Sequence, residues 1–361
     1  MSNSEEKKGL SVHRRMVMQG GTALVAAAAG VAAMAKQAQA AESGGSGFPA
    51  HKRWKLVFVN HVTTNPFFVA TVYGIQDACK FFNCDYQWTG SETAIVGQMV
   101  NAMDAAIASK ADAIAVAIVD PTAFNAPTEA ALQAGIPVFS YNADAPAKSG
   151  NKRLAYIGQD LYQAGYTMGE KIVDLVGSGH VALFIATPGQ LNIQPRIDGA
   201  AAAIKASGKP ITFDEVATGA TIDLELPKVK AYYLGHQDVK GMFAVDAGST
   251  QSIGEVMKEF GLAAKGIHGG GFDLVPRTLQ AINEGVLSFT IDQQPYLQGF
   301  YTVMEMVMYL ASGGLVGPAD IDTGLKFVTQ STVEPYLKTQ TRYEGSSSKP
   351  QIVPRSGPIG A

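Results

Sequence analysis

Short β-rich apolar runs alternate with segments of helical period along most of this chain. The helical segments include 93–109, 161–176 and 249–261. Repeated strand, helix, strand order requires parallel sheets covered by helices on both faces. The strand-like runs lie at 55–60, 85–89, 113–119, 137–141, 154–158, 181–186, 211–216, 241–245, 266–272, 287–291 and 325–329. These are too many for one comfortable sheet, so we predict an α/β protein with two doubly wound parallel-sheet lobes. A (β/α)₈ barrel is the rival arrangement, and it accounts for fewer of the strands.

The first forty residues have the order of an export signal. His13, Arg14 and Arg15 precede an Ala-rich apolar run at 20–35, and a small-x-small cleavage site ends at Ala40. The apolar run is too short to span a membrane. The adjacent arginines favour the twin-arginine route, with an ordinary Sec signal as the alternative. We therefore expect a periplasmic protein that begins with a flexible leader at 41–51.

Composition and motifs narrow the function classes. The chain has 361 residues, 47% of them hydrophobic, with 28 Lys and Arg against 31 Asp and Glu. This balance argues against nucleic-acid binding. The first strand is not followed by a dinucleotide-binding glycine turn, and the chain lacks phosphate-loop, nucleophile-elbow and zinc-protease motifs. We therefore expect no catalytic residue, metal site or cofactor.

The two cysteines, Cys79 and Cys84, are five residues apart. On one helix that spacing is too wide for a disulfide. Buried free thiols are the favoured state, and a small loop disulfide is the alternative in an oxidising compartment.

Residues just past the strand ends are the candidate ligand-binding residues, because ligands of open parallel sheets lie outside the carboxyl ends of the strands. They are mostly amides and carboxylates, with one arginine and two aromatic rings. The set is His61, Asn65, Phe67, Phe68, Asn142, Asp144, Gln159, Arg196, Asp246, Asp273 and Gln293. Sugar hydroxyls are donors and acceptors at once, and aromatic rings cover sugar C–H faces. The set therefore predicts a polyhydroxylated ligand.

Structural roles compete with ligand binding at the first strand end. Asn65 precedes Pro66 and suits a helix cap. Phe67 and Phe68 could both pack in the core, but adjacent helical residues diverge by about 100°. At least one of these rings should therefore face the cleft.

The charged candidates have structural alternatives as well. Arg196 near a helix N-terminus opposes the helix dipole and requires an acceptor nearby. Asp246 and Asp273 both suit helix caps. His61 suits a structural hydrogen bond as well as a ligand contact.

Several stretches together resemble a known family. They are VNHVTTNPFFVATVYGIQDACK, GIPVFSYNAD, YIGQDLYQAGYTMGE, RIDG at 196–199, FAVDAGSTQSIGEV, GGGFD and TIDQQPY. From about Lys55 to Tyr336 the chain resembles the periplasmic sugar-binding proteins of the ribose-binding type, the solute-binding subunits of ABC importers. Sugar-responsive repressors of the LacI type share this fold but carry a DNA-binding head where this chain has an export signal.

The resemblance implies roles for the matching positions. Asn65 matches the asparagine that bonds sugar hydroxyls, and Phe67 and Phe68 match an aromatic pair of which one ring stacks on the sugar. Arg196 and Asp273 match the family's binding arginine and aspartate.

Other positions depart from the ribose binders. Asn142 and Ala143 stand where those proteins have aspartate and arginine, which puts ribose in doubt. Gln159 replaces a small hydroxyl residue, His61 replaces a small polar residue, and Asp246 stands where asparagine is common. A different sugar or a sugar alcohol is therefore expected.

The resemblance also implies the domain organisation. We expect three crossings between the lobes, near Gln159, Gln293 and Phe327. The expected segments are 52–159 plus 294–327 for the N-terminal lobe, 160–293 plus 328–345 for the C-terminal lobe, and a flexible tail at 346–361.

The implied mechanism is hinge closure around a monosaccharide or polyol, which is then delivered to an ABC permease. A second role toward a chemoreceptor or sensor kinase is compatible with the sequence. The alternatives are an exported α/β enzyme acting on a sugar and a LacI-type regulator.

Overall fold

A computed structural model describes residues 48–315, 317–339 and 342–347. Contacts divide the chain at Arg53, and both sheets lie in the unit from Arg53 onward. The predicted export signal, most of the leader and most of the tail lie outside the described residues.

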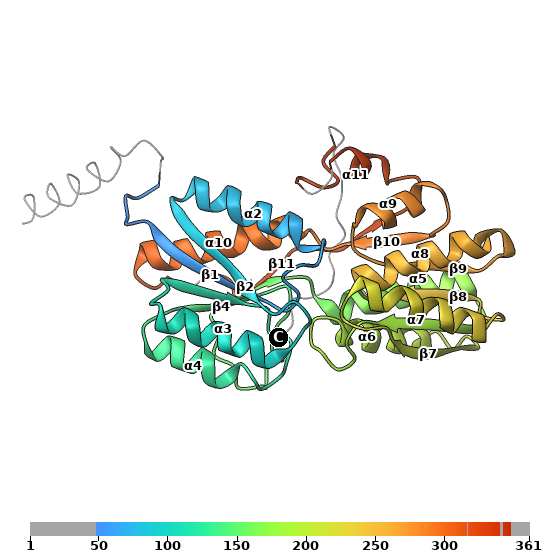
Figure 1. Ribbon diagram of the computed structural model, residues 1–361, viewed down its shortest axis with the longest axis horizontal. Helices are drawn as coiled ribbons and strands as arrows, with labels where there is room; N and C mark the ends of the chain where they lie inside the picture. The colour runs from blue at the N-terminus through green and yellow to red at the C-terminus, as the bar shows by residue number, and fades with distance from the viewer. Residues whose placement is uncertain (1–47, 316, 340–341, 348–361) are drawn as a thin grey trace, which may run out of the picture. The chain divides into compact units, whose positions relative to one another are not determined.

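The first sheet has six strands in the order β11-β5-β4-β3-β1-β2, all paired in parallel (Figure 1). Its strands are β1 (Trp54–Asn60), β2 (Cys84–Gly90), β3 (Ala113–Val116), β4 (Val138–Tyr141), β5 (Tyr156–Gly158) and β11 (Asp320–Asp322). Its helices are α2 (Phe68–Phe81), α3 (Val96–Ala108), α4 (Asn125–Gln133) and α10 (Pro295–Ser312). Helix α2 packs on α10, and α3 contacts α4.

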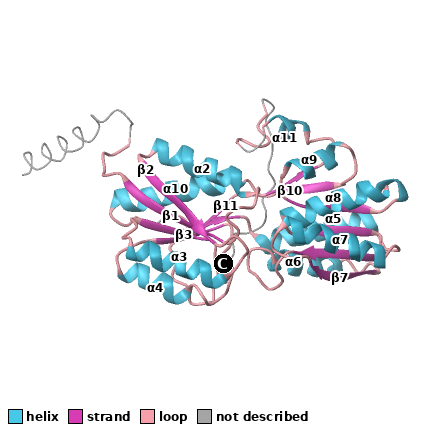
Figure 2. Ribbon diagram, in the orientation of Figure 1, coloured by secondary structure: helices cyan, strands magenta, loops and turns pink. Residues whose placement is uncertain are grey.

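The second sheet repeats this arrangement in the order β12-β10-β9-β8-β6-β7 (Figure 2). Only β12 runs antiparallel to its neighbour, β10. Its strands are β6 (Gly179–Ile185), β7 (Ile211–Ala217), β8 (Gly241–Ala244), β9 (His268–Phe272), β10 (Phe289–Asp292) and β12 (Lys326–Val328). Its helices are α5 (Leu161–Val176), α6 (Gln194–Ala206), α7 (Ile222–Gly235), α8 (Ala247–Phe260), η1 (Ala263–Lys265), α9 (Pro276–Asn283) and α11 (Glu334–Lys338). The predicted fold of two α/β lobes is confirmed.

The second lobe has a hydrophobic core on each face of its sheet. Along β6, Val181 and Leu183 join the core formed with α5 and α6. Ala182 and Phe184 join the core formed with α7, α8 and α9. Successive side chains of a strand point to opposite faces. An uninterrupted apolar run in β6 therefore serves both cores.

Helices α5 and α6 meet at a glycine contact. A Cβ atom on Gly165 would lie 2.1 Å from the carbonyl oxygen of Arg196, and one on Gly199 would lie 2.1 Å from the carbonyl oxygen of Tyr162. These glycines permit close backbone approach, which sets the position of the first turn of α6.

Three crossings join the lobes, and the third differs from the prediction. The first follows β5 at Gln159, and the second follows β10 at Gln293. The third lies at 323–325, between β11 of the first sheet and β12 of the second. The crossing was predicted near Phe327 and lies two residues before it, because Phe327 is within β12 and its ring packs on Phe289.

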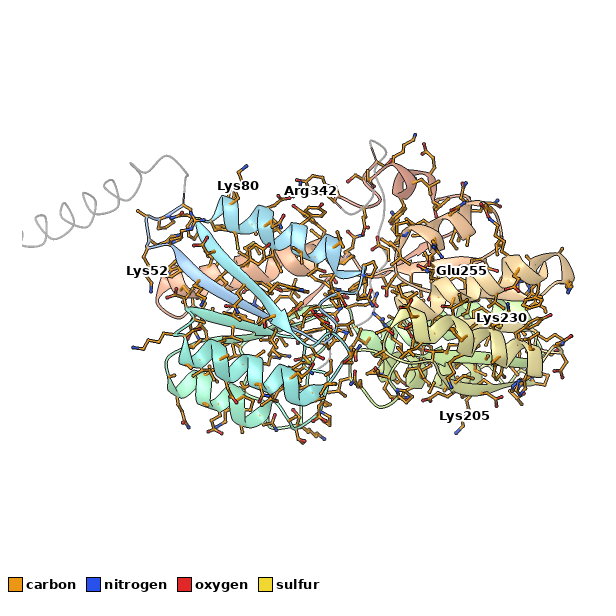
Figure 3. The ribbon with its side chains drawn as sticks, viewed as in Figure 1. Lys52, Lys80, Lys205, Lys230, Glu255 and Arg342 are labelled. Carbon is orange, nitrogen blue, oxygen red and sulfur yellow. The ribbon has the colours of Figure 1, made fainter. Side chains whose placement is uncertain are left out.

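The end of the described chain also departs from the predicted lobe boundary. Arg342 donates to Asp77 of α2 at 3.1 Å, and Tyr343 packs on Tyr296 of α10 (Figure 3 labels Arg342). Both residues were assigned to the C-terminal lobe, but these contacts are with helices of the first lobe.

Both cysteines are free and buried. Burial raises the pKa of the Cys79 thiol to about 12 and that of Cys84 to about 11. They are the free thiols that the sequence favoured.

Candidate functional site

Seven of the predicted site residues have buried side chains near the carboxyl ends of the strands or at the crossings. None of them is more than 9% exposed. They are His61 after β1, Asn142 after β4, Gln159 and Gln293 at crossings, Arg196 in the first turn of α6, Asp246 after β8 and Asp273 after β9. Burying so many polar groups costs free energy unless each one has a hydrogen-bond partner. The contacts of these side chains therefore show which of their polar atoms the protein itself satisfies.

Two of these residues have strained backbones. Asn142 has φ 63° and Asp273 has φ 78°, although neither is glycine. Left-handed backbone conformations of non-glycine residues are uncommon and cluster at functional sites. Each residue directly follows a strand, β4 and β9 respectively, where the turn directs its side chain.

Arg196 is the buried cation of the site. Nη1 donates to the carbonyl oxygen of Val245 at 2.9 Å, and Nη2 donates to Oε1 of Gln159 at 3.2 Å. The guanidinium carbon lies 4.0 Å from the ring centroid of Phe272, a cation–π contact. Burial lowers the pKa of Arg196, while Asp273 and Asp246 oppose the shift. The acceptor that the sequence required for this arginine is thus a backbone carbonyl and an amide.

Asp273 is the acidic counterpart of Arg196. Its Oδ1 accepts a hydrogen bond from Nε2 of Gln293 at 2.6 Å. Burial raises the pKa of Asp273 to about 6, with Arg196 and the Gln293 bond acting in the opposite direction. Arg196 and Gln293 thus favour the ionised form of Asp273, against the effect of burial.

An amide network continues from Gln293 to the first lobe. Nε2 of Gln298, in α10, donates to Oε1 of Gln293 at 3.1 Å, and Nδ2 of Asn142 donates to Oε1 of Gln298 at 3.1 Å. Asp273 and Asn142, from different lobes, are thereby joined through residues next to the second crossing.

Asp246 is both a candidate site residue and a helix cap. Its Oδ1 accepts from the Ser249 amide at 2.8 Å, and its Oδ2 accepts from the Ala186 amide at 2.9 Å. It is thus the N-cap of α8. Burial raises the pKa of Asp246, and these amides and Arg196 counteract the shift.

His61 forms a hydrogen bond between the lobes. Its Nε2 lies 3.1 Å from Nδ2 of Asn192, in the loop before α6. Burial lowers the pKa of His61 to about 4, so the ring is neutral at physiological pH. His61 Nδ1, Asn192 Oδ1 and Arg196 Nε are buried and have no hydrogen-bond partner in the protein. Buried polar groups are nearly always satisfied, so these three atoms are candidates for contact with a ligand.

Phe67 and Phe68 form an aromatic cluster that spans both lobes. With Ala247 and Val275 of the second lobe they make one buried cluster, and Trp88 packs against it. The ring centroids of Phe67 and Phe68 are 4.8 Å apart, and those of Phe68 and Trp88 are 5.7 Å apart. Both rings therefore lie between the lobes.

Asn65 is half-buried, and its Oδ1 accepts from the Phe67 amide at 3.0 Å. This bond closes the turn before α2, but the N-cap of that helix is Phe67, without a side-chain cap bond, so the helix-cap alternative for Asn65 is wrong. The resemblance-based role, in which Asn65 bonds sugar hydroxyls, stays a prediction.

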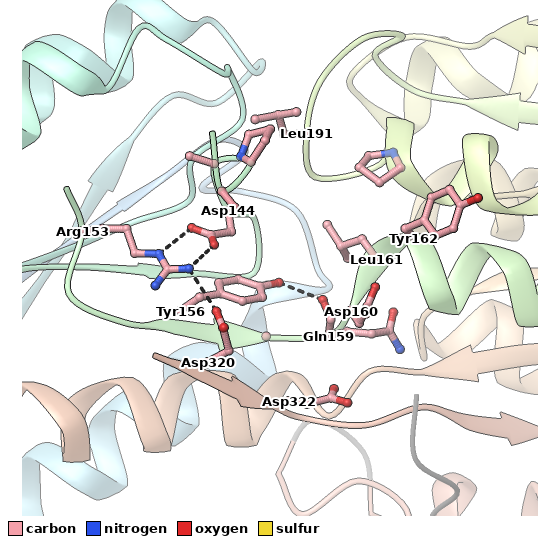
Figure 4. A pocket seen from close by; sticks show the side chains of 15 residues that line it. Asp144, Arg153, Tyr156, Gln159, Asp160, Leu161, Tyr162, Leu191, Asp320 and Asp322 are labelled. Atoms are coloured by element: carbon pink, nitrogen blue, oxygen red, sulfur yellow. Dashed lines mark hydrogen bonds and ion pairs between the residues drawn. The ribbon is translucent and has the colours of Figure 1, made fainter. Parts of the chain in front are cut away.

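Asp144 lies in an ion-pair cluster beside the first crossing. It accepts from Nε of Arg153 at 3.0 Å, and Arg153 also donates to Asp320 at 3.0 Å (Figure 4). These three residues line a cavity of about 330 Å³ whose wall includes Gln159 and Tyr156. Since Arg153 neutralises Asp144, the structure gives Asp144 an ion-pairing role beside the first crossing.

Four residues of the site or its surroundings were not selected from the sequence: Trp88, Asn192, Gln298 and Glu225. Asn192 follows β6 and carried the same strand-end signal as its neighbours. Trp88 lies within a strand, while Gln298 and Glu225 lie within helices, where no local pattern distinguishes them from structural residues.

Within the described ranges, no group of three His, Cys, Asp or Glu side chains could hold a metal ion. The helices of this part of the chain include none with the length and apolar character of a membrane span.

Comparison with known proteins identifies the family. A sequence profile described as the periplasmic binding protein domain matches residues 56–314. The chain belongs to the periplasmic binding protein family. It is also 54% identical over 312 residues to the xylose/arabinose-binding protein XylF of Sulfolobus acidocaldarius, covering 83% of this chain and 77% of that protein.

Solved structures agree on the fold. An ABC transporter solute-binding protein of Burkholderia graminis, in complex with D-arabinose, matches with a TM-score of 0.73 and 27% identity, covering 80% of this chain and 99% of that one. A solute-binding protein of Agrobacterium vitis with bound D-fucose has a TM-score of 0.74 at 22% identity, covering 79% and 98% of the two chains. The predicted solute-binding protein of an ABC sugar importer is confirmed, as is its extracytoplasmic place.

Proposed function

We propose that this protein binds a neutral pentose of the xylose or arabinose type between its lobes and delivers it to an ABC permease. The proposal draws on the 54% identity to a xylose/arabinose-binding protein. The D-arabinose complex of the relative at 27% identity supports the same class of ligand. Sugar alcohols of similar size remain within the proposed class.

The observation that carries this proposal is the set of unpartnered buried atoms. Arg196 Nε is a donor and Asn192 Oδ1 is an acceptor. With Asn192 donating to Nε2 of His61, the proton of that ring lies on Nδ1, which is a second donor. A ligand that completes all three must both donate and accept hydrogen bonds, as sugar hydroxyls do.

The charges of the site favour a neutral ligand. Arg196 interacts with both Asp273 and Asp246, so its charge is already compensated by buried carboxylates. A sugar acid would bring a further negative charge beside two aspartates, which is unfavourable in a buried site.

Closure of the lobes would couple to binding. The His61–Asn192 bond and the packing of Phe67 and Phe68 on Ala247 and Val275 join opposite lobes. A ligand that bonds residues of both lobes stabilises the closed arrangement by its differential affinity.

The remaining parts of the proposal concern export and domain limits. We infer export by the twin-arginine route with cleavage after Ala40. The proposed lobes are 52–159 with 294–322, and 160–293 with 326–339. The closed form would dock on a permease, and we propose a sensor kinase or chemoreceptor as a second partner.

A thermal-shift screen of the mature protein, freed of carried-over ligand by unfolding and refolding, tests the function. D-xylose, L-arabinose, D-arabinose, D-ribose, D-fucose and xylitol form the panel. A ligand that binds only the native state raises the melting temperature. At a ligand concentration a hundredfold above Kd, the free energy of unfolding increases by about 2.7 kcal/mol. A stereospecific shift from a pentose, lost in Arg196→Met but kept in the surface control Lys205→Met, is expected. Equal shifts from all sugars, or none, contradict the proposal.

A further inference from the structure

Glu225 is a buried carboxyl group that the proposed site does not yet use. It lies in the first turn of α7 and is 3% exposed. Its Oε2 has no hydrogen-bond partner in the protein. A Cβ atom on Gly248 would lie 1.6 Å from this oxygen. The absence of a side chain at Gly248 therefore makes the room in which the Glu225 carboxyl group sits.

Glu225 is paired with Asp246. The Glu225 carboxyl group lies against Gly248, in the first turn of the helix that Asp246 caps, and it interacts with the Asp246 carboxyl group. A hydrogen bond between two carboxyl oxygens requires a proton on one of them. Asp246 has two backbone amides and Arg196 to stabilise its negative charge. Glu225 has no such donors, and burial followed by the charge of Asp246 raises its pKa to about 10. Glu225 is therefore the favoured site for a shared proton, because Asp246 has the donors that stabilise a negative charge.

Other charged groups lie farther from Glu225. Helix α8 packs along α7, with Gly248 against Glu225 at their N-terminal ends and Glu259 bonded to Lys230 at 2.6 Å toward their C-terminal ends (Figure 3 labels Lys230). The remaining charged residues of α8, Glu255 and Lys258, pair with Arg277 and Glu284. Arg196 and Asp273 act on Asp246. Asp246 is thus the charged group that determines the state of Glu225.

The pair is close to the proposed sugar site. Asp246 is directly followed by Ala247, which packs with Phe67 and Phe68 in the cluster between the lobes. Asp246 also interacts with Arg196, whose Nε lacks a partner. A residue that holds the Asp246 carboxylate in place therefore influences a side chain next to the proposed ligand position.

We propose that Glu225 is a positioning residue of the sugar site, which holds Asp246 as a correctly oriented carboxylate by donating to it from a neutral carboxylic acid. Sugar binding then depends on a proton retained at Glu225. This inference rests on the proposed function, and it names a residue and a protonation state of the same site.

Calorimetric titration with D-xylose and L-arabinose from pH 6 to pH 10.5 tests the inference. Wild type is compared with Glu225→Gln, which keeps a donor that cannot ionise, and with Glu225→Leu, which removes it. Asp223→Asn is the matched control, since it removes an exposed carboxylate from the same turn.

We expect wild-type affinity to fall by up to about fourfold between pH 8 and pH 10.5, because an acid with a pKa of about 10 is largely ionised at pH 10.5. Glu225→Gln should show a clearly smaller fall, and Glu225→Leu should bind about tenfold more weakly at pH 7, the cost of one lost hydrogen bond to a charged group. Asp223→Asn should follow the wild type. Equal affinities of wild type and Glu225→Leu, or parallel pH profiles of wild type and Glu225→Gln, overturn the inference.

A second measurement separates this inference from the proposed function. If no sugar binds the wild type, the proposed function fails, and the ligand-free melting temperatures still test the proton on Glu225. Because the folded pKa is raised, wild-type stability is lost as pH rises from about 4.5 to about 10. The melting temperature of Glu225→Gln relative to wild type should therefore rise over that range. A difference that does not change with pH shows that Glu225 carries no proton.

Discussion

Substitution of Gly165 by alanine should separate α5 from α6 and displace Arg196. The new Cβ atom would lie 2.1 Å from the carbonyl oxygen and 2.4 Å from the Cα atom of Arg196, where ordinary contact begins at 3.4 Å. The difference, 3.4 − 2.1 = 1.3 Å, is the least movement that relieves the overlap with this oxygen. Both obstructing atoms belong to the backbone, so a side-chain rotation cannot relieve it.

Two opposing contributions determine how Gly165→Ala changes the free energy of unfolding. Overpacking costs about 1–3 kcal/mol, and alanine in place of glycine in a helix contributes up to about 1 kcal/mol of stabilisation. A net loss of about 1–2 kcal/mol is expected, which corresponds to a few degrees in melting temperature. A movement of 1.3 Å would also break the 2.9 Å bond to Val245 and the 3.2 Å bond to Gln159 that hold the guanidinium group. Two such bonds are worth about 1–3 kcal/mol, or about tenfold in Kd.

Gly97→Ala is the matched control. Gly97 lies in α3, and a Cβ atom there meets nothing within 4 Å. The same substitution should leave sugar affinity unchanged and raise stability by up to about 1 kcal/mol. Melting temperatures and calorimetric Kd values for D-xylose are the readouts. Wild-type stability and affinity in Gly165→Ala would refute the reasoning that the glycine contact positions Arg196.

Three further predictions follow from individual contacts. Because burial holds the folded pKa of His61 near 4 against 6.5, its stabilising contribution is present above pH 6.5 and is lost as pH falls toward 4. The free energy of unfolding of wild type relative to His61→Gln should therefore fall by up to about 3 kcal/mol between pH 6.5 and pH 4. A difference in denaturant titrations that does not depend on pH would show that the neutral His61 ring does not contribute in this way. Trp88 packs on the cluster between the lobes. Sugar should therefore change the tryptophan fluorescence of Trp54→Phe, which keeps Trp88, and should not change that of Trp88→Phe. The reverse pattern would place the ligand elsewhere. Cys79 and Cys84 are buried with raised pKa values, so a disulfide-exchange reagent at pH 8 should label both in denaturant and neither in the native protein, and rapid native labelling would contradict their burial.

Local patterns in the sequence were sufficient for most of the architecture. Continuous apolar runs such as that of β6 mark strands buried on both faces, and the predicted helix at 161–176 has the bounds of α5. Strand β11 was missed because its three residues, Asp320 to Asp322, are mostly charged and none is fully buried. A short strand of this kind is stabilised by pairing with β5 and not by an apolar pattern, and missing it displaced the predicted third crossing to Phe327.

The candidate site, like the fold, could be predicted only in part from the sequence. Residues directly after strands, such as Asn142 and Asp273, could be selected from sequence because parallel strands align their carboxyl ends at one edge. The tertiary structure alone decided which of them share a site. Asp144 fits the strand-end rule as well as Asn142, yet Arg153 pairs with it beside the first crossing.

The sequence by itself determined the succession of strands and helices, the family and the types of side chain at the strand ends, because these depend on neighbours in the chain. The tertiary structure decided the His61–Asn192 bond, the Asn142–Gln298 bond and the contact of Glu225 with Gly248. The residues of the first two pairs are 131 and 156 positions apart. Such contacts arise only when the two lobes and their helices pack, and no periodicity or local spacing encodes them.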